Sequence, residues 1–423
     1  MRTYDHQRAR LSASCVALAM TLALAGCEDS TSAPEASQAA DTNLPSAVAE
    51  AKASGTSVDP SIVVADNGFG LSLLTQLIQG SDGNNVAISP VSIGLALQIA
   101  YNGAAGATQQ TMAQTLQLGA LSTQQLNDAN AALQAILIDA DPAVTLSIAN
   151  SLWMHLEDNS VLPSFAHMDQ TYYGATIGDL SGAPANVNTW IANATHGLIT
   201  QVLPPANYAQ IVAVLANAVY FKAQWTNAFD PNQTAFAPFT TEKGIEISVE
   251  MMHQTGSYPY LHGPNFQAVR IPYGNSRFSM LIVLPDPGTS LASFVAGITP
   301  ASLTDGVNQM RVISGTIALP RFTVTFGAKL NAALTALGMG TAFCPDGDLP
   351  GIAPLACIAY VGHASVVQVD ESGTVAAGST VVSTVTAVPS PSFTMTIDYP
   401  FFYAVRDDQS GELLFVGVLE DPT

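Results

Sequence analysis

The sequence has few basic residues, and over one long stretch it has none. Lys and Arg together number 12 against 32 Asp and Glu, which gives a formal net charge of −20, and no Lys or Arg occurs between Lys52 and Lys222. Binding to nucleic acid or to another polyanion requires cations clustered on one surface. We therefore expect no nucleic-acid partner and no polyanionic cofactor, and we attribute the acidic balance to solubility.

The sequence also lacks the common catalytic and cofactor-binding motifs. It contains no Gly-x-Ser-x-Gly elbow, no His-Glu-x-x-His pair, no phosphate-binding loop and no Cys-x-x-Cys, and its 7 His are scattered. Each of these motifs brings together the groups that one type of chemistry requires. Their absence argues against an enzyme, and we expect no catalytic residue, no cofactor and no metal site.

Cysteine is scarce: the chain has 4, of which Cys15 and Cys27 lie near the N-terminus. The other two, Cys344 and Cys357, are close to each other in the sequence. In an oxidising compartment they could pair and close a short loop. Two buried thiols are an equal alternative, and the sequence leaves both open.

The N-terminus has the pattern of an export signal. Three arginines within residues 1–10 precede an apolar run over residues 11–25, which is too short for a transmembrane helix. The run ends in LAGC at residues 24–27, which resembles the lipobox of bacterial lipoproteins, in which the cysteine is lipidated after cleavage. This resemblance implies a signal peptide over residues 1–26, a lipid on Cys27, and an extracytoplasmic protein anchored in the bacterial cell envelope, facing the periplasm or the cell surface. An ordinary signal peptide cut nearby is the alternative.

The rest of the chain divides into a tether and one domain. Residues 27–65 are rich in Ser, Ala, Asp, Glu and Thr and show no apolar periodicity, which predicts a disordered acidic tether. No Pro- or Gly-rich linker interrupts residues 66–423, so we expect one large domain there.

Helical and strand patterns alternate within this domain, which indicates an α+β fold with large sheets. The apolar run over residues 211–221 predicts a central strand buried on both faces. Ser89 and Pro90 have the residue types expected at the start of a helix. Further expected elements are a strand over residues 317–326, a helix over residues 328–337, and a hairpin of strands 401–405 and 413–418.

One stretch near the C-terminus is suited both to a loop and to a strand. Residues 373–388 contain no charge, no proline and no bulky aromatic, and their second half is β-branched. In a strand, six small or medium residues would share one face: Thr374, Ala376, Gly378, Thr380, Val382 and Thr384. The segment could therefore lie outside as a loop or inside as a strand, and a flexible surface loop is the simplest alternative.

Several segments, in the same order along the chain, resemble the serpin family over residues 66–422. They are NVAISPVSI (85–93), NAVYFKAQW (217–225), LPRF (319–322), VDESGTVAA (369–377), DYPFF (398–402) and LFVG (414–417). A single match would be weak, but this many in order is specific. The resemblance implies a serpin fold, with large sheets surrounded by helices and an exposed reactive centre loop near the C-terminus.

The resemblance also implies a mechanism. The loop offers a bait peptide bond to a serine protease, which forms an acyl-enzyme. Cleavage frees the upstream half of the loop, which inserts as a new strand into the large sheet and distorts the attached protease. A strand that joins a sheet must bury one face and pair its backbone, and the uncharged face of residues 374–384 meets that need. We therefore expect a monomeric serine-type protease inhibitor that works once and is not an enzyme.

The resemblance assigns residues to three sites of the family. The hinge of the reactive loop would comprise Glu371, Gly373, Thr374, Ala376, Ala377 and Gly378. The shutter, a polar cluster beneath the opening sheet, would comprise Ser89, Ser92, Asn217 and His363. Trp225 would be the breach residue at the top of the sheet, where the loop enters. Val375 departs from the family's usual glutamate, but it lies on the outward face of the hinge.

The family's spacing of fourteen residues from the hinge glycine places the bait bond at Ala387–Val388. Counting back from Pro400 gives a site near Pro389 instead, where a serine protease would cut poorly, so we prefer Ala387 and keep Thr386 and Thr384 as fallback sites. The residues before this bond are small and uncharged. They favour a protease with a shallow apolar specificity pocket, such as an elastase-like or subtilisin-like enzyme.

A non-inhibitory serpin, serving as an envelope binding or structural lipoprotein, is the main alternative function. Non-inhibitory members usually carry a bulky or charged residue in the hinge, whereas this hinge has Thr374 followed by alanines and glycine. A protease complex that survives denaturing gel electrophoresis would distinguish the two functions.

Overall fold

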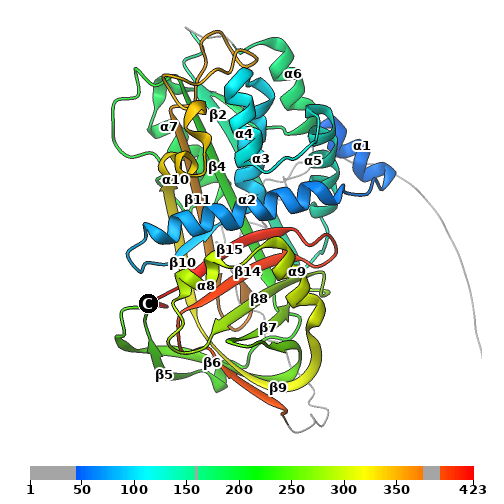
Figure 1. The fold of residues 1–423 in the computed structure, drawn as a ribbon, viewed down its shortest axis with the longest axis vertical. Helices are drawn as coiled ribbons and strands as arrows, with labels where there is room; N and C mark the ends of the chain where they lie inside the picture. Colours follow the sequence, from blue (N-terminus) through cyan, green and yellow to red (C-terminus); the bar gives the residue numbers. More distant parts are fainter. Residues whose placement is uncertain (1–43, 158–160, 375–390) are drawn as a thin grey trace, which may run out of the picture. The chain divides into compact units, whose positions relative to one another are not determined.

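The computed structural model describes residues 44–157, 161–374 and 391–423. These residues belong to one compact unit, Leu44–Thr423, whose helices and strands are labelled in Figure 1. The predicted signal peptide, Cys27 and the first part of the predicted tether lie outside the described residues.

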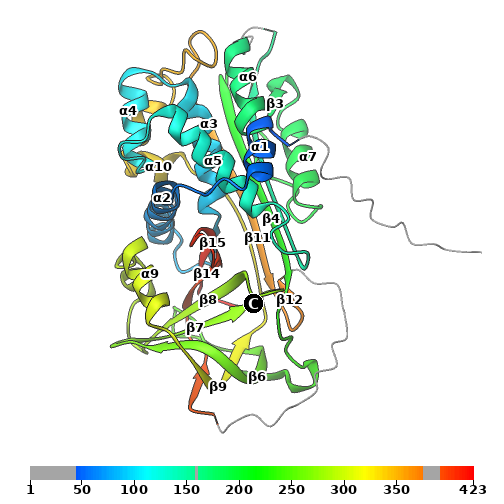
Figure 2. The same cartoon turned by 90° about the vertical axis from the view of Figure 1, so that its right-hand side faces the viewer.

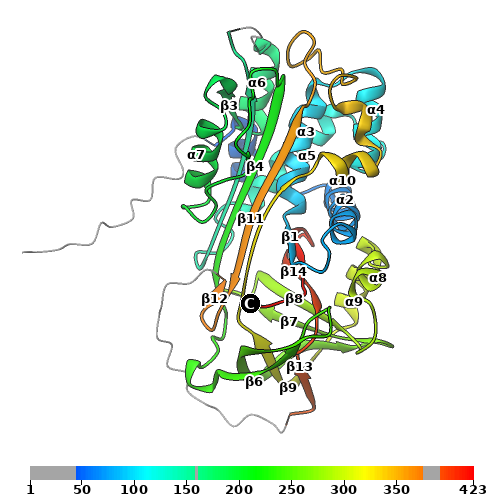
Figure 3. The same ribbon diagram turned by 90° about the vertical axis from the view of Figure 1, so that its left-hand side faces the viewer.

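A six-stranded sheet runs through one part of this unit. Its strands follow the order β10 (Phe322–Lys329), β11 (Tyr360–Val369), β12 (Gly373–Thr374), β4 (Ala213–Gln224), β2 (Val144–Met154) and β3 (Thr176–Asp179). Helix α3 (Pro90–Gly103) packs on one face of this sheet and α7 (Ala185–Ala194) on the other, as Figure 3 shows. Because both faces are covered, β4 is buried over most of its length, which confirms the predicted central strand.

A nine-stranded sheet forms the second layer of strands. Its order is β1 (Val86–Ile88), β15 (Leu413–Leu419), β14 (Phe401–Asp407), β8 (Phe278–Pro285), β7 (Phe266–Pro272), β6 (Glu246–His262), β9 (Arg311–Pro320) and β13 (Phe393–Thr396), with β5 (Ala235–Thr240) paired to β6. The predicted C-terminal hairpin is confirmed, since β14 and β15 pair antiparallel, from Phe401 opposite Leu419 to Val405 opposite Phe415.

The remaining helices pack around the two sheets (Figures 1 and 2). They are α1 (Ser46–Ser54), α2 (Pro60–Gln79), α4 (Gly106–Thr115), α5 (Thr123–Leu137), α6 (Pro163–Tyr172), α8 (Leu291–Ala296), α9 (Pro300–Gln309) and α10 (Asn331–Ala336), with short 3₁₀ turns at η1 (Leu180–Gly182), η2 (Pro231–Gln233) and η3 (Met339–Ala342). Helices and mixed sheets in one core confirm the predicted α+β class.

The predicted strand over residues 317–326 is wrong, because the chain changes sheets within it. Strand β9 ends at Pro320 in the nine-stranded sheet, and β10 begins at Phe322 in the six-stranded sheet. Arg321 lies between them, and its amide donates to the carbonyl of Glu250 (2.9 Å). Apolar residues continue on both sides of Arg321, so the sequence resembles one long strand. The apolar positions nevertheless change parity, from Ile317 and Leu319 to Phe322 and Val324, where the fold has two strands. The helix predicted from residue 328 also starts later, at Asn331, because β10 remains paired with β11 up to Lys329.

The predicted tether over residues 27–65 is wrong in its second half. Helix α1 packs on α5 and α6 through a small cluster of its own, in which Val48 is fully buried beside Ala131 and Ala135. Helix α2 begins at Pro60, where the Asp59 carboxylate caps it by accepting from the amide of Ser61 (2.9 Å). Helix α1 could not be predicted from the sequence, because its apolar residues are mostly alanines and show no clear amphipathic pattern.

Helix α2 is the one helix among the described residues with the length and apolar composition of a membrane span, with a mean hydropathy of 1.3. It is nevertheless a core helix. Phe69, Leu73 and Leu74 are fully buried, and the helix packs on α3 and β15. Its apolar character is explained by the core that it joins.

Candidate functional site

The first residues of the predicted hinge already form a strand in the six-stranded sheet. Strands β11 and β4 pair directly and in parallel from Tyr360 opposite Val214 to Ser365 opposite Val219. Further along, β12 lies between them, with Thr374 opposite both Val369 of β11 and Ala223 of β4. Figure 3 shows β12 at this end of the two long strands. The two residues of β12 therefore separate β11 from β4 at this end of the sheet.

Gly373 is required at this position. A Cβ built on it would lie 2.0 Å from the carbonyl oxygen of Ala223 in β4, and its φ is +153°. No other residue type can approach the neighbouring strand so closely. The glycine therefore sets where the chain enters the sheet.

Thr374 and Trp225 are brought together by a residue that the sequence did not single out, Tyr273. Thr374 is 1 % exposed, and its hydroxyl shares a hydrogen bond of 2.6 Å with the hydroxyl of Tyr273. The Tyr273 ring stacks on the Trp225 ring, with 4.3 Å between centroids and 9° between planes. The Trp225 indole N–H in turn donates to the carbonyl of Asp370 (2.9 Å). Trp225 and Tyr273 thus lie against Thr374 and Asp370, on either side of the turn into β12.

Glu371 is held by an ion pair with Arg321, the residue between β9 and β10. Arg321 donates from Nε (2.8 Å) and Nη2 (2.6 Å) to one carboxylate oxygen, and the hydroxyl of Thr234 donates to the other. Burial acts to raise the pKa of Glu371, but the bonds from Arg321 and Thr234 outweigh it and hold the pKa below its ordinary value. The chain is therefore fixed just before it turns into β12.

Three of the four predicted shutter residues form one buried hydrogen-bonded chain. Nδ1 of His363 in β11 lies 2.8 Å from Oδ1 of Asn217 in β4, and Nδ2 of Asn217 donates to the carbonyl of Ser92 in α3 (2.9 Å). Asn217 also donates to the side chain of Asn150 in β2, which the sequence did not single out. Ser89 precedes α3 as expected, but its buried hydroxyl makes no hydrogen bond within the described residues. These hydrogen bonds join β11 to β4 in the part of the sheet where the two strands pair directly with each other.

His363 is neutral in this cluster. Its ring is fully buried, and burial lowers its pKa to about 3. The imidazole therefore acts as a fixed hydrogen-bonding group between two strands.

Cys344 and Cys357 are joined by a disulfide, with their Cα atoms 5.2 Å apart. The loop that they close packs on the helices around it: Gly351 donates its amide to the carbonyl of Gly103 (2.9 Å), and Leu162 donates to the carbonyl of Ile352 (2.7 Å). The loop leads into β11, so the disulfide fastens the chain at the start of that strand.

Several predicted site residues lie outside the described residues. They are the hinge residues Ala376, Ala377 and Gly378, the bait residues Ala387 and Val388, and Cys27. Within residues 44–157, 161–374 and 391–423, no three His, Cys, Asp or Glu side chains gather in a way that could hold a metal ion.

The sequence missed the contacts made by Tyr273, Thr234 and Arg321. All three come from segments far from the hinge in the chain, and none belongs to a motif with a chemical signature. Only Arg321 could have been noticed in the sequence, because it lies in the LPRF segment that resembles the family.

Comparison with known proteins agrees with this architecture. The sequence model of the family described as "Serpin (serine protease inhibitor)" matches residues 64–422. Serpin B9 of Homo sapiens is 30% identical over 378 residues, covering 85% of this chain and 98% of the relative. The leukocyte elastase inhibitor of Homo sapiens is 28% identical over 376 residues, with 85% and 98% covered.

Solved structures share the fold. The native state of tengpin, a thermophilic serpin, is similar with a TM-score of 0.79 and 26% identity, covering 86% of this chain and 95% of tengpin. The structure of human thyroxine-binding globulin complexed with thyroxine is similar with a TM-score of 0.77 and 24% identity, covering 86% of this chain and 98% of that one. The second likeness shows the fold alone.

Proposed function

Because this chain belongs to the serpin family, with the serpin fold expected from its sequence, we propose that it inhibits a serine protease by inserting its own cleaved loop into the six-stranded sheet. The protease would attack the bait bond and become bound as an acyl-enzyme. The freed upstream half of the loop would then extend β12 between β11 and β4 and carry the protease with it.

The observation that supports this proposal most directly is the position of β12. Gly373 and Thr374 lie between two strands that pair with each other further along, so each residue added to β12 takes the place of a pairing between β11 and β4. The new strand would gain a partner on both sides, which satisfies its backbone groups. The residues of one parity after Thr374 are small and uncharged, so they can follow it into the core.

The hydrogen bonds of the shutter residues would have to break during this insertion. The bond between His363 and Asn217 joins the two strands that must separate, and both side chains are buried. Breaking a buried hydrogen bond costs about 1–3 kcal/mol unless it is replaced. We expect such bonds to contribute to the barrier that keeps the uninserted state in place until cleavage.

The residues around the proposed bait bond favour a protease with a small apolar specificity pocket. Val385, Thr386 and Ala387 offer no charge to the buried carboxylate of a trypsin-like pocket and do not fill a deep aromatic one. An elastase-like or subtilisin-like protease should accept Ala387 best. The likeness to a relative named leukocyte elastase inhibitor is compatible with this choice.

Incubation with purified proteases tests the function. Elastase or subtilisin should give a complex with this chain that survives denaturing gel electrophoresis, and trypsin should give little or none. Cleavage by all three enzymes without any such complex would contradict inhibition and favour the non-inhibitory alternative, an envelope binding or structural protein.

Ala387→Arg should redirect the inhibitor to trypsin-like proteases. We expect the rate of complex formation with trypsin to rise at least a hundredfold, because arginine fills a pocket that carries a carboxylate, and the rate with elastase to fall. Ala387→Val is the matched control, which keeps the site small and uncharged. Mass spectrometry of the released fragment gives the cut bond, and a new N-terminus well away from residues 385–389 would refute the assignment.

We further propose that Cys27 carries the lipid anchor and that the mature protein is an extracytoplasmic monomer in the bacterial cell envelope. The support is the apolar run followed by LAGC at residues 24–27. Stable attachment requires more than one acyl chain, which a diacylated cysteine provides.

Cys27→Ser should move the protein out of the membrane fraction or leave it unprocessed. On phase separation of a detergent extract, the parent chain should enter the detergent phase and the variant the aqueous phase. Cys15→Ser is the control, since residue 15 would be removed with the signal peptide. Recovery of the parent chain in the aqueous phase alone would exclude the anchor.

A further inference from the structure

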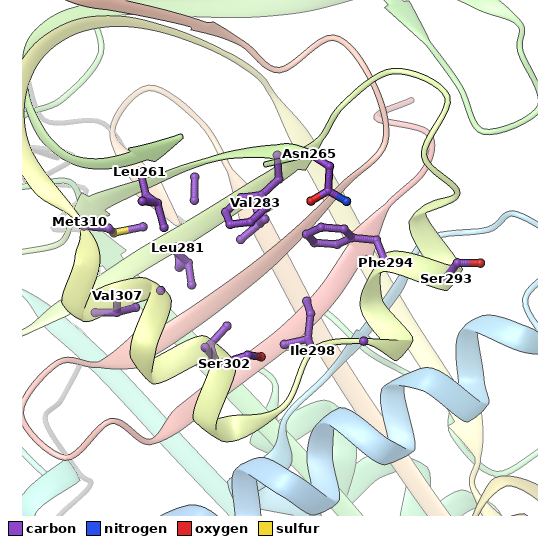
Figure 4. Close-up of a pocket in the computed structure, with 15 residues that line it drawn as sticks. Leu261, Asn265, Leu281, Val283, Ser293, Phe294, Ile298, Ser302, Val307 and Met310 are labelled. Atoms are coloured by element: carbon purple, nitrogen blue, oxygen red, sulfur yellow. The ribbon is translucent and has the colours of Figure 1, made fainter. Parts of the chain in front are cut away.

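Tyr273 connects the nine-stranded sheet to the hinge. It directly follows β7, a strand that begins beside the groove between α9 and strands β7 and β8 shown in Figure 4 and ends next to β4. Tyr273 forms an isolated antiparallel bridge with Trp225, the residue after β4. Beside this bridge the amide of Gly274 donates to the carbonyl of Gln224 (2.9 Å). The end of β7 is therefore joined to the end of β4, next to β12.

Two aromatic rings hold the ring of Tyr273 in place. It stacks on Trp225, with 4.3 Å between centroids, and meets Phe221 of β4 edge to face, with 5.4 Å between centroids. Tyr273 is fully buried, and burial raises the pKa of its hydroxyl, which therefore keeps its proton. A side chain packed in this way has little freedom, so its hydroxyl stays at 2.6 Å from the hydroxyl of Thr374.

The two hydroxyls depend on each other. Both residues are buried, and among the described residues neither hydroxyl has another hydrogen-bond partner. Removal of one hydroxyl would leave the other buried and unpaired, whereas removal of both would leave no unpaired group. Loss of either partner should therefore be more harmful than loss of both, which is a property that packing alone does not have.

Strand β12 has few bonds of its own to hold it in the sheet. It consists of two residues, of which Thr374 pairs with Ala223 of β4 and with Val369 of β11. Ordering each residue of a strand costs conformational entropy, and so short a strand has few backbone bonds to offset it. The bond from Tyr273 adds an attachment at Thr374, the position from which an inserting strand would continue.

We propose that Tyr273 is a positioning residue for loop insertion. Its hydroxyl holds Thr374 in the six-stranded sheet of the uncleaved protein, so that insertion extends a strand that already exists. The kinetic consequence rests on the proposed function: hydrolysis of the acyl-enzyme competes with insertion of the loop, and a strand whose first pairs are formed inserts sooner. The bond thereby favours trapped protease over released protease.

Four variants isolate the bond. Tyr273→Phe removes one hydroxyl and keeps both ring contacts, and Thr374→Val removes the other hydroxyl. The double variant removes both. Tyr208→Phe is the matched control, because Tyr208 is also buried and its hydroxyl donates to the carbonyl of Pro204 (2.9 Å) in a different apolar cluster.

Hydrogen exchange of the uncleaved chain measures how firmly the hinge is held. Read by mass spectrometry on peptides that cover residues 369–374, exchange should be at least fivefold faster in each single variant. The double variant should be closer to the parent than either single variant, and Tyr208→Phe should match the parent. No protease takes part, so this result does not depend on inhibition.

The stoichiometry of inhibition with elastase measures the effect on insertion. Its excess over one is the ratio of the hydrolysis rate to the insertion rate. This excess should rise at least fivefold in each single variant and less in the double variant, while the rate constant of association stays within twofold of the parent. Most of the complex still forms as long as insertion outruns hydrolysis.

The outcomes separate the bond from general packing and from the proposed function. Unchanged exchange in both single variants, or a double variant with the sum of the two single effects, would overturn the proposal. Faster exchange with an unchanged stoichiometry would refute the part of Tyr273 in insertion. If Tyr273→Phe folds poorly, Thr374→Val carries the same test from the other side of the bond. Absence of any complex with the parent would refute the proposed function, and hydrogen exchange would still decide whether Tyr273 holds the hinge.

Discussion

Thr374→Arg should abolish inhibition and turn the protein into an ordinary substrate of its target protease. The side chain of Thr374 is 1 % exposed between β11 and β4, and its hydroxyl bonds to Tyr273, which stacks on Trp225. An arginine at this position would bring a charge into the buried space beside the rings of Tyr273 and Trp225. The cost is several kcal/mol, and it falls on the first step of strand insertion.

The measurement is the fraction of protein that forms a covalent complex with elastase, read on a denaturing gel. We expect at least a hundredfold less complex for Thr374→Arg, with cleavage of the bait bond still fast, because the charge blocks insertion and leaves the loop accessible. Thr374→Val is the matched control: it keeps the size and loses only the hydroxyl, so it should retain most of the complex. Complex formation by the arginine variant at the stoichiometry of the parent would refute the role of this face.

The structure changes one part of this expectation. From the sequence alone, Thr374 turns inward only as insertion begins, so Thr374→Arg should leave the stability of the uncleaved protein unchanged. In the structure Thr374 is already paired in β12. We therefore expect the arginine variant to lose β12 from the sheet before any cleavage, with a change in the fluorescence of Trp225, whose indole donates to the carbonyl of Asp370 beside the hinge.

The sequence predicted best where a pattern is local or a motif is specific. The buried strand β4 and the C-terminal hairpin follow from runs of apolar residues. The family motifs assigned Ser92 and Asn217 to one cluster, and the spacing of His363 from Glu371 assigned His363 to it. The two strands and the helix that carry these residues are far apart in the chain, so no local rule could have joined them.

The sequence failed where tertiary contacts decide. The switch from β9 to β10 at Arg321 interrupts the strand pattern only by a change of parity. Helix α1 is stabilised by docking on α5 and α6. Tyr273 gave no signal at all, since its role depends on a stacked ring and a hydroxyl brought to the hinge by β7 and β8. The disulfide was left open because two cysteines do not reveal their distance in the fold.

A buried acid pair is the basis of the second large prediction. Asp66 in α2 and Glu412 in the turn between β14 and β15 are both fully buried. One oxygen of Asp66 accepts from Gln98 (2.9 Å), but its other oxygen and both oxygens of Glu412 have no hydrogen-bond partner among the described residues. Asp407, also fully buried, differs because Arg277 pairs with it (3.0 Å).

These surroundings raise both pKa values. Burial raises the pKa of Asp66 to about 8, despite the bond from Gln98. Burial also raises the pKa of Glu412 well above its ordinary value, and the negative charges of Asp66 and Asp407 raise it further. The folded protein therefore keeps protons on these groups at a pH where the unfolded chain, with carboxyl pKa values of about 4, has released them.

The sign of the pH effect follows from this difference. The stabilising contribution of Asp66 and Glu412 is fully present below about pH 4, where the folded and the unfolded chain both hold these protons. It is lost as the pH rises from there through the folded pKa values, because in this range the unfolded chain has released protons that the folded chain still holds. Each such acid lowers the free energy of unfolding by roughly 1 kcal/mol per pH unit in that range. Asp169, with a pKa raised by burial to about 6, and Glu420, raised by burial to about 7, act in the same direction over narrower ranges.

Glu412→Gln should therefore stabilise the protein increasingly as the pH rises from 5 to 8. The amide is close to the carboxyl group in size and carries no charge, so the variant no longer gains from proton binding at low pH and no longer suffers from charge at high pH. The difference in unfolding free energy between variant and parent should grow by roughly 1 kcal/mol per pH unit. Asp169 and Glu420 are present in both chains and cancel from this difference.

Urea unfolding of both chains at several pH values between 5 and 8 measures the effect, with Glu246→Gln, a glutamate exposed on β6, as the control that should follow the parent at every pH. Parallel pH curves for the parent and Glu412→Gln would mean that Glu412 is solvated or paired in the folded protein, and the buried acid pair would then be refuted. A widening gap would show that Glu412 keeps its proton in the folded protein and that its burial lowers the free energy of unfolding as the pH rises.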